Sequence, residues 1–260
     1  MNKLSASEHQ VIEALRAARH VVVFTGAGIS AESGIPTYRD ALTGLWENFD
    51  FAELATPDAF RRDPALVWGW YEWRRMKVMR ADPNPAHRAI EAMASKVPRF
   101  TLITQNVDNL HERAGSTDVI HLHGSLASPH CFACARPHEL PSDIPDEPHG
   151  GRRLEPPRCL HCGGRIRPGV VWFGESLPKD AWSAAMSAVE MEGCDLFFSI
   201  GTSAMVYPAA ELPFTALRRQ ATVVQINPDL TQLDEVASIS LHSAAADVLP
   251  RLVEAAWPNA

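Results

Sequence analysis

The cysteines Cys131, Cys134, Cys159 and Cys162 form two Cys-x-x-Cys pairs. Four thiolates in two turn-forming pairs match a tetrahedral zinc site. Because protein ligands would fill every position around the metal, none is left for water or substrate, and we expect a structural zinc. Disulfide pairing is one alternative. Replacement of a cysteine by a neighbouring histidine is another, the candidates being His130, His138 and His161.

A glycine turn, Gly26-x-Gly28-x-x-Ala31, follows directly after the apolar run Val21 to Thr25. Between a strand and a helix this pattern is typical of a dinucleotide site, because glycines let the backbone approach the pyrophosphate and helix amides hold it. An ordinary tight turn would have the same sequence. The acidic residue expected about 20 positions further on is not evident, which disfavours an ordinary dehydrogenase.

Polar residues also follow three other apolar runs. Gln105, Asn106 and Asp108 follow 100–104, Gly201-Thr202-Ser203 follows 196–200, and Asn227-Pro228-Asp229 follows 222–226. The carboxyl ends of parallel strands meet at one edge of a sheet, where such sheets bind their ligands. We therefore expect these residues to converge on a ligand. Polar turns capped by their own side chains are the alternative.

Two histidines, His121 and His123, lie at the end of a further apolar run, Val119 to Leu122. An imidazole titrates near neutral pH and can act as a general base. A hydrogen-bonded structural histidine is the alternative for either residue. Residues two apart on a strand share a face, so alternation does not say which imidazole would meet a ligand.

The elements that must position these residues alternate between strand and helix patterns. The apolar runs are continuous rather than alternating, as expected of parallel strands covered on both faces. Helical patterns occur at 85–96, 179–191 and 209–219, and Ser5 with Glu8 forms a capping box before a first helix. This order predicts an α/β fold, a Rossmann-like doubly wound parallel sheet. Cys194, just before one run, is expected to be a buried thiol.

Two stretches interrupt the alternation. Residues 39–80 are rich in Trp and Phe and contain a predicted helix at 64–79, and residues 128–168 contain the paired cysteines and many prolines. We expect a helical insert at 39–80 and a small zinc-binding module at 128–168. The Rossmann-like domain then comprises residues 1–38, 81–127 and 169–260.

The whole chain has 260 residues, 46% of them hydrophobic, and a formal net charge of -7. This charge gives no broad basic field for a phosphate backbone, so nucleic acid is not expected as the principal partner. Charged residues interrupt the N-terminal region, and no stretch approaches the roughly 18 apolar residues of a membrane span. We expect a monomeric, cytoplasmic protein without a membrane partner.

Taken together, these motifs resemble the sirtuin family. The segments that carry the resemblance are 26–36, 104–111, 121–124, 201–203 and 226–228, in the family's order, and it covers about residues 10 to 255. Each motif is weak alone, but their coincidence with the cysteine pairs is specific. The resemblance implies an NAD-dependent protein lysine deacylase, in which the acyl-lysine carbonyl oxygen attacks the ribose carbon of NAD as nicotinamide leaves. The products would be nicotinamide, 2'-O-acyl-ADP-ribose and free lysine.

The resemblance also implies roles for individual residues. His123 would be the general base, Asn106 would lie near the ribose and reaction water, and Asp108 would face the nicotinamide amide. The implied NAD-binding residues are Gly26, Ala27, Gly28, Ser30, Ala31, Tyr38, Arg39, Trp46, Gln105, Asn106, Val107, Asp108, Gly201, Thr202, Ser203, Asn227, Pro228, Asp229 and Ala245. Tyr38 departs from the family's usual Phe, which adds a hydroxyl to the nicotinamide pocket.

The implied substrate residues divide into a peptide-binding part and an acyl-binding part. Phe173, Gly174, Glu175 and Val206 would pair with the acyl-lysine peptide as an added strand. Tyr71 and Arg74 match the Tyr-x-x-Arg motif of sirtuins that remove succinyl and malonyl groups, since Arg binds a carboxylate bidentately and Tyr donates a further hydrogen bond. Ala55 matches a small residue that leaves room for the longer acyl chain.

Two other functions use the same features. A mono-ADP-ribosyltransferase shares the cofactor and the bond that breaks, but leaves ADP-ribose on protein. A non-catalytic NAD sensor with a zinc-binding module needs no base at the ribose, so the combination of Asn106, Asp108 and His123 argues against it.

Overall fold

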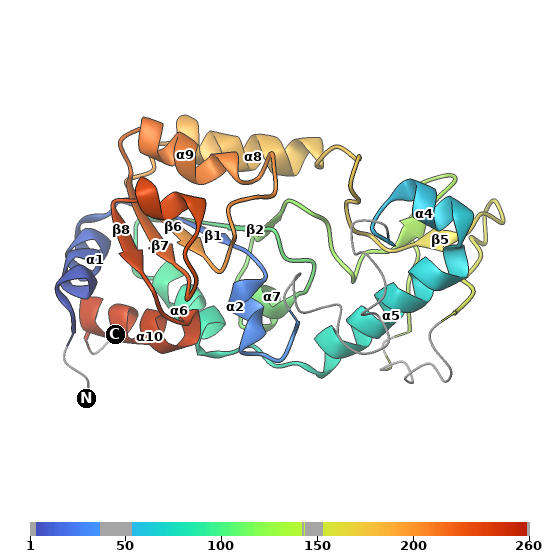
Figure 1. Cartoon of the computed structure of the whole chain (residues 1–260), viewed down its shortest axis with the longest axis horizontal. Helices are drawn as coiled ribbons and strands as arrows, with labels where there is room; N and C mark the ends of the chain where they lie inside the picture. The colour runs from blue at the N-terminus through green and yellow to red at the C-terminus, as the bar shows by residue number, and fades with distance from the viewer. Residues whose placement is uncertain (1–3, 37–53, 142, 144–152, 259–260) are drawn as a thin grey trace.

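The computed structural model describes residues 4–36, 54–141, 143 and 153–258 (Figure 1). Its main sheet has the order β3-β2-β1-β6-β7-β8, and every neighbouring pair is parallel. The strands are β1 (His20–Thr25), β2 (Arg99–Thr104), β3 (Ile120–His121), β6 (Leu196–Ile200), β7 (Thr222–Ile226) and β8 (Ile239–Leu241). The predicted Rossmann-like doubly wound sheet is therefore confirmed.

The two faces of the sheet are covered by different helices, because alternate residues of each strand point to opposite sides. Val21 and Val23 of β1 belong to a core formed with α1 (Ala6–Ala17), α6 (Pro85–Ala94) and α10 (Ala245–Ala256). Val22 and Phe24 belong to a core formed with α8 (Lys179–Glu190) and α9 (Glu211–Arg218). Figure 1 shows α8 and α9 on the opposite side of the sheet from α6 and α10.

The first helix begins as the sequence predicts. The Ser5 hydroxyl accepts a hydrogen bond from the Glu8 N–H at 3.2 Å, and the Glu8 carboxylate accepts one from the Ser5 N–H at 2.7 Å. This reciprocal pair satisfies two N–H groups that have no partner within the helix. The remaining short helices are α2 (Gly28–Ala31), α7 (Leu110–Arg113) and the 3₁₀-helix Gln232–Glu235.

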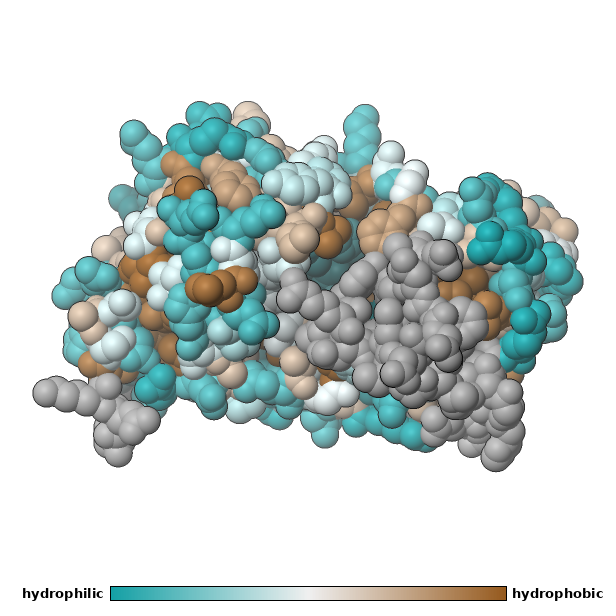
Figure 2. All heavy atoms as spheres, viewed as in Figure 1, coloured by the Kyte–Doolittle hydropathy of each residue, from teal (hydrophilic) through white to brown (hydrophobic). Residues whose placement is uncertain are grey.

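A second lobe contains α4 (Pro57–Arg62), α5 (Pro64–Arg80) and a two-stranded antiparallel sheet of β4 (His130–Cys131) and β5 (Ile166–Arg167). The sequence assigns these elements to two separate inserts. In the structure they share one hydrophobic core, which includes Phe60, Trp70 and Ile166. Figure 1 shows this lobe at the far end of the molecule from α1, and in Figure 2 hydrophilic side chains cover much of the described surface of both lobes.

The structure confirms some of the predicted elements and corrects others. The strand predicted over 119–122 is shorter, and β8 was not predicted. The helix predicted over 64–79 is confirmed as α5, and Cys194 is buried as expected. Among the described residues, no helix combines the length and the apolar character that crossing a membrane requires.

Candidate active site and zinc site

The loops that follow β1 and β6 approach each other very closely. The Gly28 N–H donates to the Gly201 carbonyl at 2.8 Å. A Cβ atom at Gly28 would lie 2.7 Å from the Gly201 Cα, and one at Gly201, whose φ is +61°, would lie 2.4 Å from the Ile29 nitrogen. Glycine is therefore required at both positions because the two loops are in backbone contact. The dinucleotide pattern in the sequence does not reveal this requirement.

Three loops are connected through Thr202. Gln105, after β2, donates from its side-chain amide to the Thr202 hydroxyl at 2.9 Å. Asn227, after β7, donates from its side-chain amide to the Thr202 carbonyl at 2.9 Å. The structure thus brings together the residues that the sequence placed after separate strands, at the expected edge of the sheet.

A second polar group joins α2 to the loop after β2. The Ser30 hydroxyl donates to the Asp108 carboxylate at 3.0 Å and accepts from the Asn106 side-chain amide at 3.2 Å. Burial raises the pKa of Asp108, although the Ser30 hydroxyl and the Leu110 N–H oppose this shift. Asn106 and Asp108 are each 6% exposed, so the site presents a carboxylate and an amide in a water-poor place.

The two histidines have different partners, which distinguishes them. His123 Nδ1 lies 3.1 Å from the Gln105 carbonyl, so this nitrogen carries the proton and Nε2 keeps its lone pair. His121 Nδ1 lies 3.2 Å from the Asn106 carbonyl and its Nε2 lies 2.5 Å from the Glu112 carboxylate. Both nitrogens of His121 face acceptors, and only His123 has the geometry of a base.

The pKa shifts follow these contacts. Burial lowers the pKa of His123, and the hydrogen bond to Gln105 only partly opposes this effect. Burial also acts to lower the pKa of His121, but the Glu112 carboxylate outweighs it and the pKa of His121 is raised. His123 is therefore neutral at pH 7 and able to accept a proton, whereas His121 retains its proton to a higher pH.

The remaining sequence-predicted residues lie as follows. The loops after β1, β2, β6 and β7 contain Ala27, Val107, Ser203, Pro228 and Asp229, whereas Ala31 ends α2 and Ala245 begins α10. The Val107 carbonyl accepts a hydrogen bond from the Leu126 N–H at 2.9 Å. Tyr38, Arg39 and Trp46 lie outside the described residues.

The predicted substrate strand is held by the protein on one side. Val171 and Phe173 donate their N–H groups to the carbonyls of His123 and Ala55, at 2.8 and 2.9 Å. The N–H of Trp172 binds the Glu175 carboxylate at 2.9 Å. The Trp172 carbonyl also accepts the Glu175 N–H at 3.0 Å, so several backbone groups of this segment already have partners within the protein. Val206, in the loop between β6 and α9, is half-buried.

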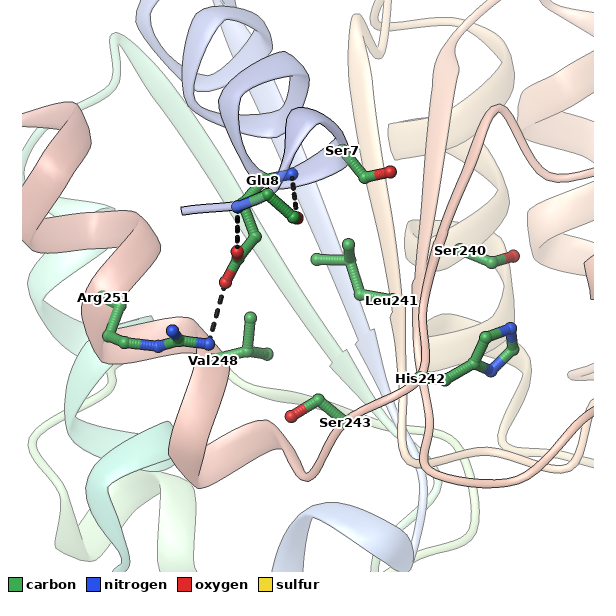
Figure 3. A pocket seen from close by; sticks show the side chains of 9 residues that line it. Ser7, Glu8, Ser240, Leu241, His242, Ser243, Val248 and Arg251 are labelled. Atoms are coloured by element: carbon green, nitrogen blue, oxygen red, sulfur yellow. Dashed lines mark hydrogen bonds and ion pairs between the residues drawn. The ribbon is translucent and has the colours of Figure 1, made fainter. Parts of the chain in front are cut away.

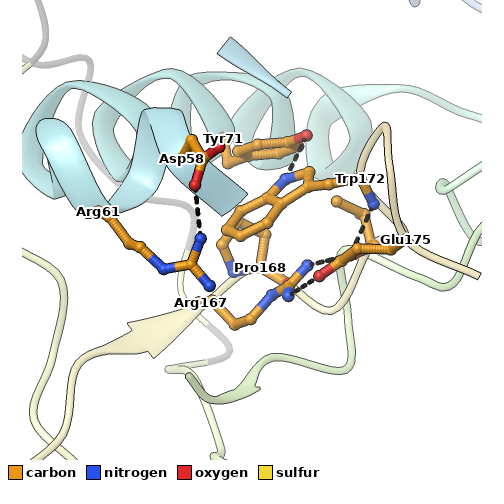
Figure 4. Close-up of polar contacts among 8 residues, drawn as sticks. Asp58, Arg61, Tyr71, Arg167, Pro168, Trp172 and Glu175 are labelled. Atoms are coloured by element: carbon orange, nitrogen blue, oxygen red, sulfur yellow. Dashed lines mark hydrogen bonds and ion pairs between the residues drawn. The ribbon is translucent and has the colours of Figure 1, made fainter. Parts of the chain in front are cut away.

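Sequence reasoning did not find the internal use of Glu175. Its carboxylate forms a bidentate ion pair with Arg167 of β5, at 2.5 and 2.8 Å (Figure 4). Glu175 therefore stabilises the fold by neutralising Arg167, a role that the sequence did not predict beside its predicted contact with the peptide. No sequence signal identifies this pair, because its members are brought together by the turn between β5 and Trp172.

Tyr71 and Arg74 lie one turn apart on α5, as predicted. Tyr71 is 3% exposed and its hydroxyl accepts a hydrogen bond from the indole N–H of Trp172 at 3.0 Å. The Arg74 guanidinium lies 5.1 Å from the centre of the Trp70 ring. Burial raises the pKa of Tyr71 to about 12, and the charge of Arg74 acts against this shift.

The four cysteines form one cluster in which all four Sγ atoms lie within 4.8 Å of one another. The Sγ atoms of Cys131 and Cys162 are 3.5 Å apart, and those of Cys134 and Cys159 are 3.8 Å apart. A zinc ion with four sulfurs at about 2.3 Å requires sulfur pairs separated by roughly 3.8 Å. The cluster fits a structural zinc, and none of His130, His138 and His161 is among its ligands.

A separate polar hollow of about 320 Å³ lies at the β8 edge of the sheet, between α1 and α10 (Figure 3). Its lining includes Glu8, Ser240, His242 and Arg251, and none of the predicted site residues. Glu8 and Arg251 form an ion pair at 2.8 Å across it. Because none of the predicted strand-end residues lines it, this hollow is not the place where they converge.

Comparison with known proteins gives a consistent result. The Sir2 family model matches residues 26–208. An "NAD-dependent protein deacylase" of Methylococcus capsulatus is 63% identical over 246 residues, which cover 95% of this chain and 96% of the relative. "NAD-dependent protein deacylase 1" of Pseudomonas aeruginosa is 56% identical over 251 residues, covering 96% and 99%.

Solved structures agree with the sequence relatives. A crystal structure of a Sir2 homologue in complex with NAD is 44% identical, has a TM-score of 0.88, and is matched over 98% of this chain and 96% of its own. A complex of Sir2 with a p53 peptide and NAD+ is 31% identical, with a TM-score of 0.81 and coverage of 94% and 96%.

We predict that Cys159→Ala abolishes zinc binding and Cys194→Ala does not. The two cysteines are buried to a similar degree, 8% and 7% exposed, but only Cys159 belongs to the cluster. Metal analysis of the purified variants should give about one zinc per chain for Cys194→Ala and almost none for Cys159→Ala. Equal zinc content in the two variants would show that the cluster is not a metal site.

We also predict that the two histidines titrate on opposite sides of their ordinary value of 6.5. Histidine NMR spectra recorded across pH should give a pKa below 6.5 for His123 and above it for His121. Glu112→Gln should lower the pKa of His121 and leave the pKa of His123 unchanged. Folding raises the pKa of His121 and lowers the pKa of Glu112. The pair therefore stabilises the fold between these two folded pKa values, and the effect is lost as pH rises through that of His121 or falls through that of Glu112. A higher pKa for His123 than for His121 would contradict the assigned partners.

Proposed function

Because the chain belongs to the Sir2 family, we propose that this NAD-dependent protein deacylase acts preferentially on succinyl- and malonyl-lysine, with acetyl-lysine as a further substrate. The observation that carries the acyl preference is the pair Tyr71 and Arg74 on one face of α5. Deacylation is the activity named for the relatives, so the ADP-ribosyltransferase and NAD-sensor alternatives are set aside.

The polar groups at the strand ends fit NAD by their chemistry. NAD supplies the ribose carbon that the acyl carbonyl oxygen attacks as nicotinamide departs. His123 offers an unprotonated Nε2 that can accept a proton from a ribose hydroxyl, because its Nδ1 proton is engaged by the Gln105 carbonyl. Its lowered pKa keeps this nitrogen available at neutral pH. With one water molecule consumed to release the lysine amine from the acyl carbon, the products would be nicotinamide, 2'-O-acyl-ADP-ribose and free lysine.

Asn106 and Asp108 supply fixed polar groups in a buried place. The Ser30 hydroxyl lies between them and orients both, through contacts of 3.2 and 3.0 Å. The Asp108 carboxylate can accept a hydrogen bond from an amide such as that of nicotinamide. Preorganised groups of this kind stabilise developing charge better than mobile water does, because they need no reorientation during the reaction.

The acyl preference is supported by the position of Arg74. Arg74 lies one turn from Tyr71 on α5, and its guanidinium lies 5.1 Å from the centre of the Trp70 ring. A carboxylate between Tyr71 and Arg74 would meet a cation and a hydroxyl donor.

Ala55 supports a longer acyl group. It lies next to the helix cap residue Thr56, is buried, and its carbonyl accepts the Phe173 N–H at 2.9 Å. The backbone bond fixes Ala55 against the predicted substrate strand, and its methyl side chain takes up little space there. Ala55 belongs to the same hydrophobic core as Tyr71 and Trp172, so a larger residue at this place would take space from that core.

The direct test is mass spectrometry of matched acetyl-, malonyl- and succinyl-lysine peptides, incubated with and without NAD. We expect NAD-dependent loss of all three groups, fastest for the two acidic ones. Equal or faster loss of acetyl would refute the acyl preference while leaving the deacylase activity intact.

We predict that Arg74→Met lowers kcat/KM for a succinyl peptide by about 10- to 100-fold, since a hydrogen bond to a charged group is worth roughly 1.5 to 3 kcal/mol. The loss for the acetyl peptide should be much smaller. Lys77→Met, which removes a positive charge one turn further along α5, is the matched control and should leave the ratio of the two rates unchanged. Equal losses on both peptides in Arg74→Met would refute the assignment.

We further propose that the enzyme acts as a monomer in the cytoplasm. Light scattering of the purified protein and fractionation of the cells that produce it test these two statements separately.

A further inference from the structure

The hydrogen bond between Trp172 and Tyr71 has a fixed direction. The indole N–H can only donate, so the Tyr71 hydroxyl oxygen is the acceptor, at 3.0 Å. Both side chains are buried, Trp172 at 1% exposure and Tyr71 at 3%. Figure 4 shows the indole nitrogen directed at the hydroxyl oxygen from the side of the substrate segment.

This direction leaves the hydroxyl proton of Tyr71 for another partner. Among the described residues, the contact with Trp172 is the hydrogen bond that Tyr71 makes. Burial raises the pKa of Tyr71 to about 12, so the hydroxyl remains protonated over the whole physiological range. With the Trp172 N–H occupying its oxygen, the group favours acceptor ligands such as a carboxylate over donor ligands.

The position of Trp172 is in turn fixed by Arg167. The guanidinium carbon lies 3.6 Å from the centre of a Trp172 ring, within the range of a cation–π contact. Arg167 also binds Glu175 bidentately and the carbonyls of Pro168 and Val170, and Glu175 accepts the backbone N–H of Trp172. The indole is therefore held at its ring face and at its backbone.

We propose that Trp172 is a positioning residue for acyl selectivity: its indole N–H holds the Tyr71 hydroxyl as a donor toward the terminal carboxylate of the acyl group. This inference rests on the proposed preference for succinyl- and malonyl-lysine. It adds that Tyr71 recognises the carboxylate only in the orientation that Trp172 imposes. An acetyl group has no terminal carboxylate, so its removal does not depend on the orientation of the Tyr71 hydroxyl.

The test compares succinyl and acetyl peptides with the full-length Trp172→Phe variant. Phenylalanine keeps an aromatic ring beneath Arg167 but removes the N–H donor. We expect kcat/KM for the succinyl peptide to fall by about 3- to 10-fold, the effect of one neutral hydrogen bond. The value for the acetyl peptide should change by less than about 2-fold. A general structural defect would lower both values together, so the ratio is the decisive readout.

Two further variants make the comparison strict. Trp68→Phe changes a buried tryptophan of the same core, on the same helix as Tyr71, and should leave the succinyl-to-acetyl ratio as in the unmodified enzyme. Tyr71→Phe removes the acceptor, so adding Trp172→Phe to it should lower the ratio no further. Should Trp172→Phe fail to fold, benzothienylalanine at position 172 keeps the shape of indole and replaces its N–H with sulfur.

The outcomes separate the two proposals. If the unmodified enzyme prefers succinyl and Arg74→Met removes that preference, while Trp172→Phe or the benzothienylalanine variant retains it, then the positioning role of Trp172 is wrong and the proposed function stands. If the unmodified enzyme shows no preference for the acidic acyl groups, both proposals fall. The inference is supported if the succinyl-to-acetyl ratio falls in the Trp172 variants and stays unchanged in Trp68→Phe.

Discussion

The close approach of Gly28 to Gly201 is the constraint on which the rest of the site depends. It brings the loops after β1 and β6 into direct backbone contact, with no room for a Cβ on either side. From these two loops Ser30 reaches Asp108, and Thr202 contacts both Gln105 and Asn227. A side chain at either glycine would separate the loops and disturb every one of these contacts, because they share the same two backbone segments.

Much of the fold could be predicted from the sequence, because its signals are local. Strands covered on both faces give continuous apolar runs, so the runs ending at Thr25, Ile200 and Ile226 were recognised. The three-residue strand β8 has one polar residue among three and gives no such signal. The sequence also does not predict that α4, α5 and the two-stranded sheet share one core. Contacts such as that between Phe60 and Trp172 join chain segments more than 100 residues apart.

In the site, too, features set by residues close in the sequence could be predicted, and features set by distant residues could not. The cysteine pairs specify their own geometry through spacing, and the structure places their sulfurs as that spacing requires. The use of Glu175 could not be predicted, because it depends on Arg167 lying against the Trp172 ring. A residue type alone does not say whether a carboxylate faces a substrate or neutralises a buried arginine.

The assignment of the two histidines shows how tertiary contacts resolve what alternation leaves open. His121 and His123 are both bound at Nδ1 by consecutive carbonyls, those of Asn106 and Gln105. The backbone that carries these carbonyls is itself held, since the Asn106 N–H donates to the Thr104 hydroxyl at 3.0 Å. One peptide segment therefore orients both imidazoles. Their hydrogen bonding differs at Glu112, which occupies the second nitrogen of His121 and so leaves His123 as the ring whose Nε2 can take a proton.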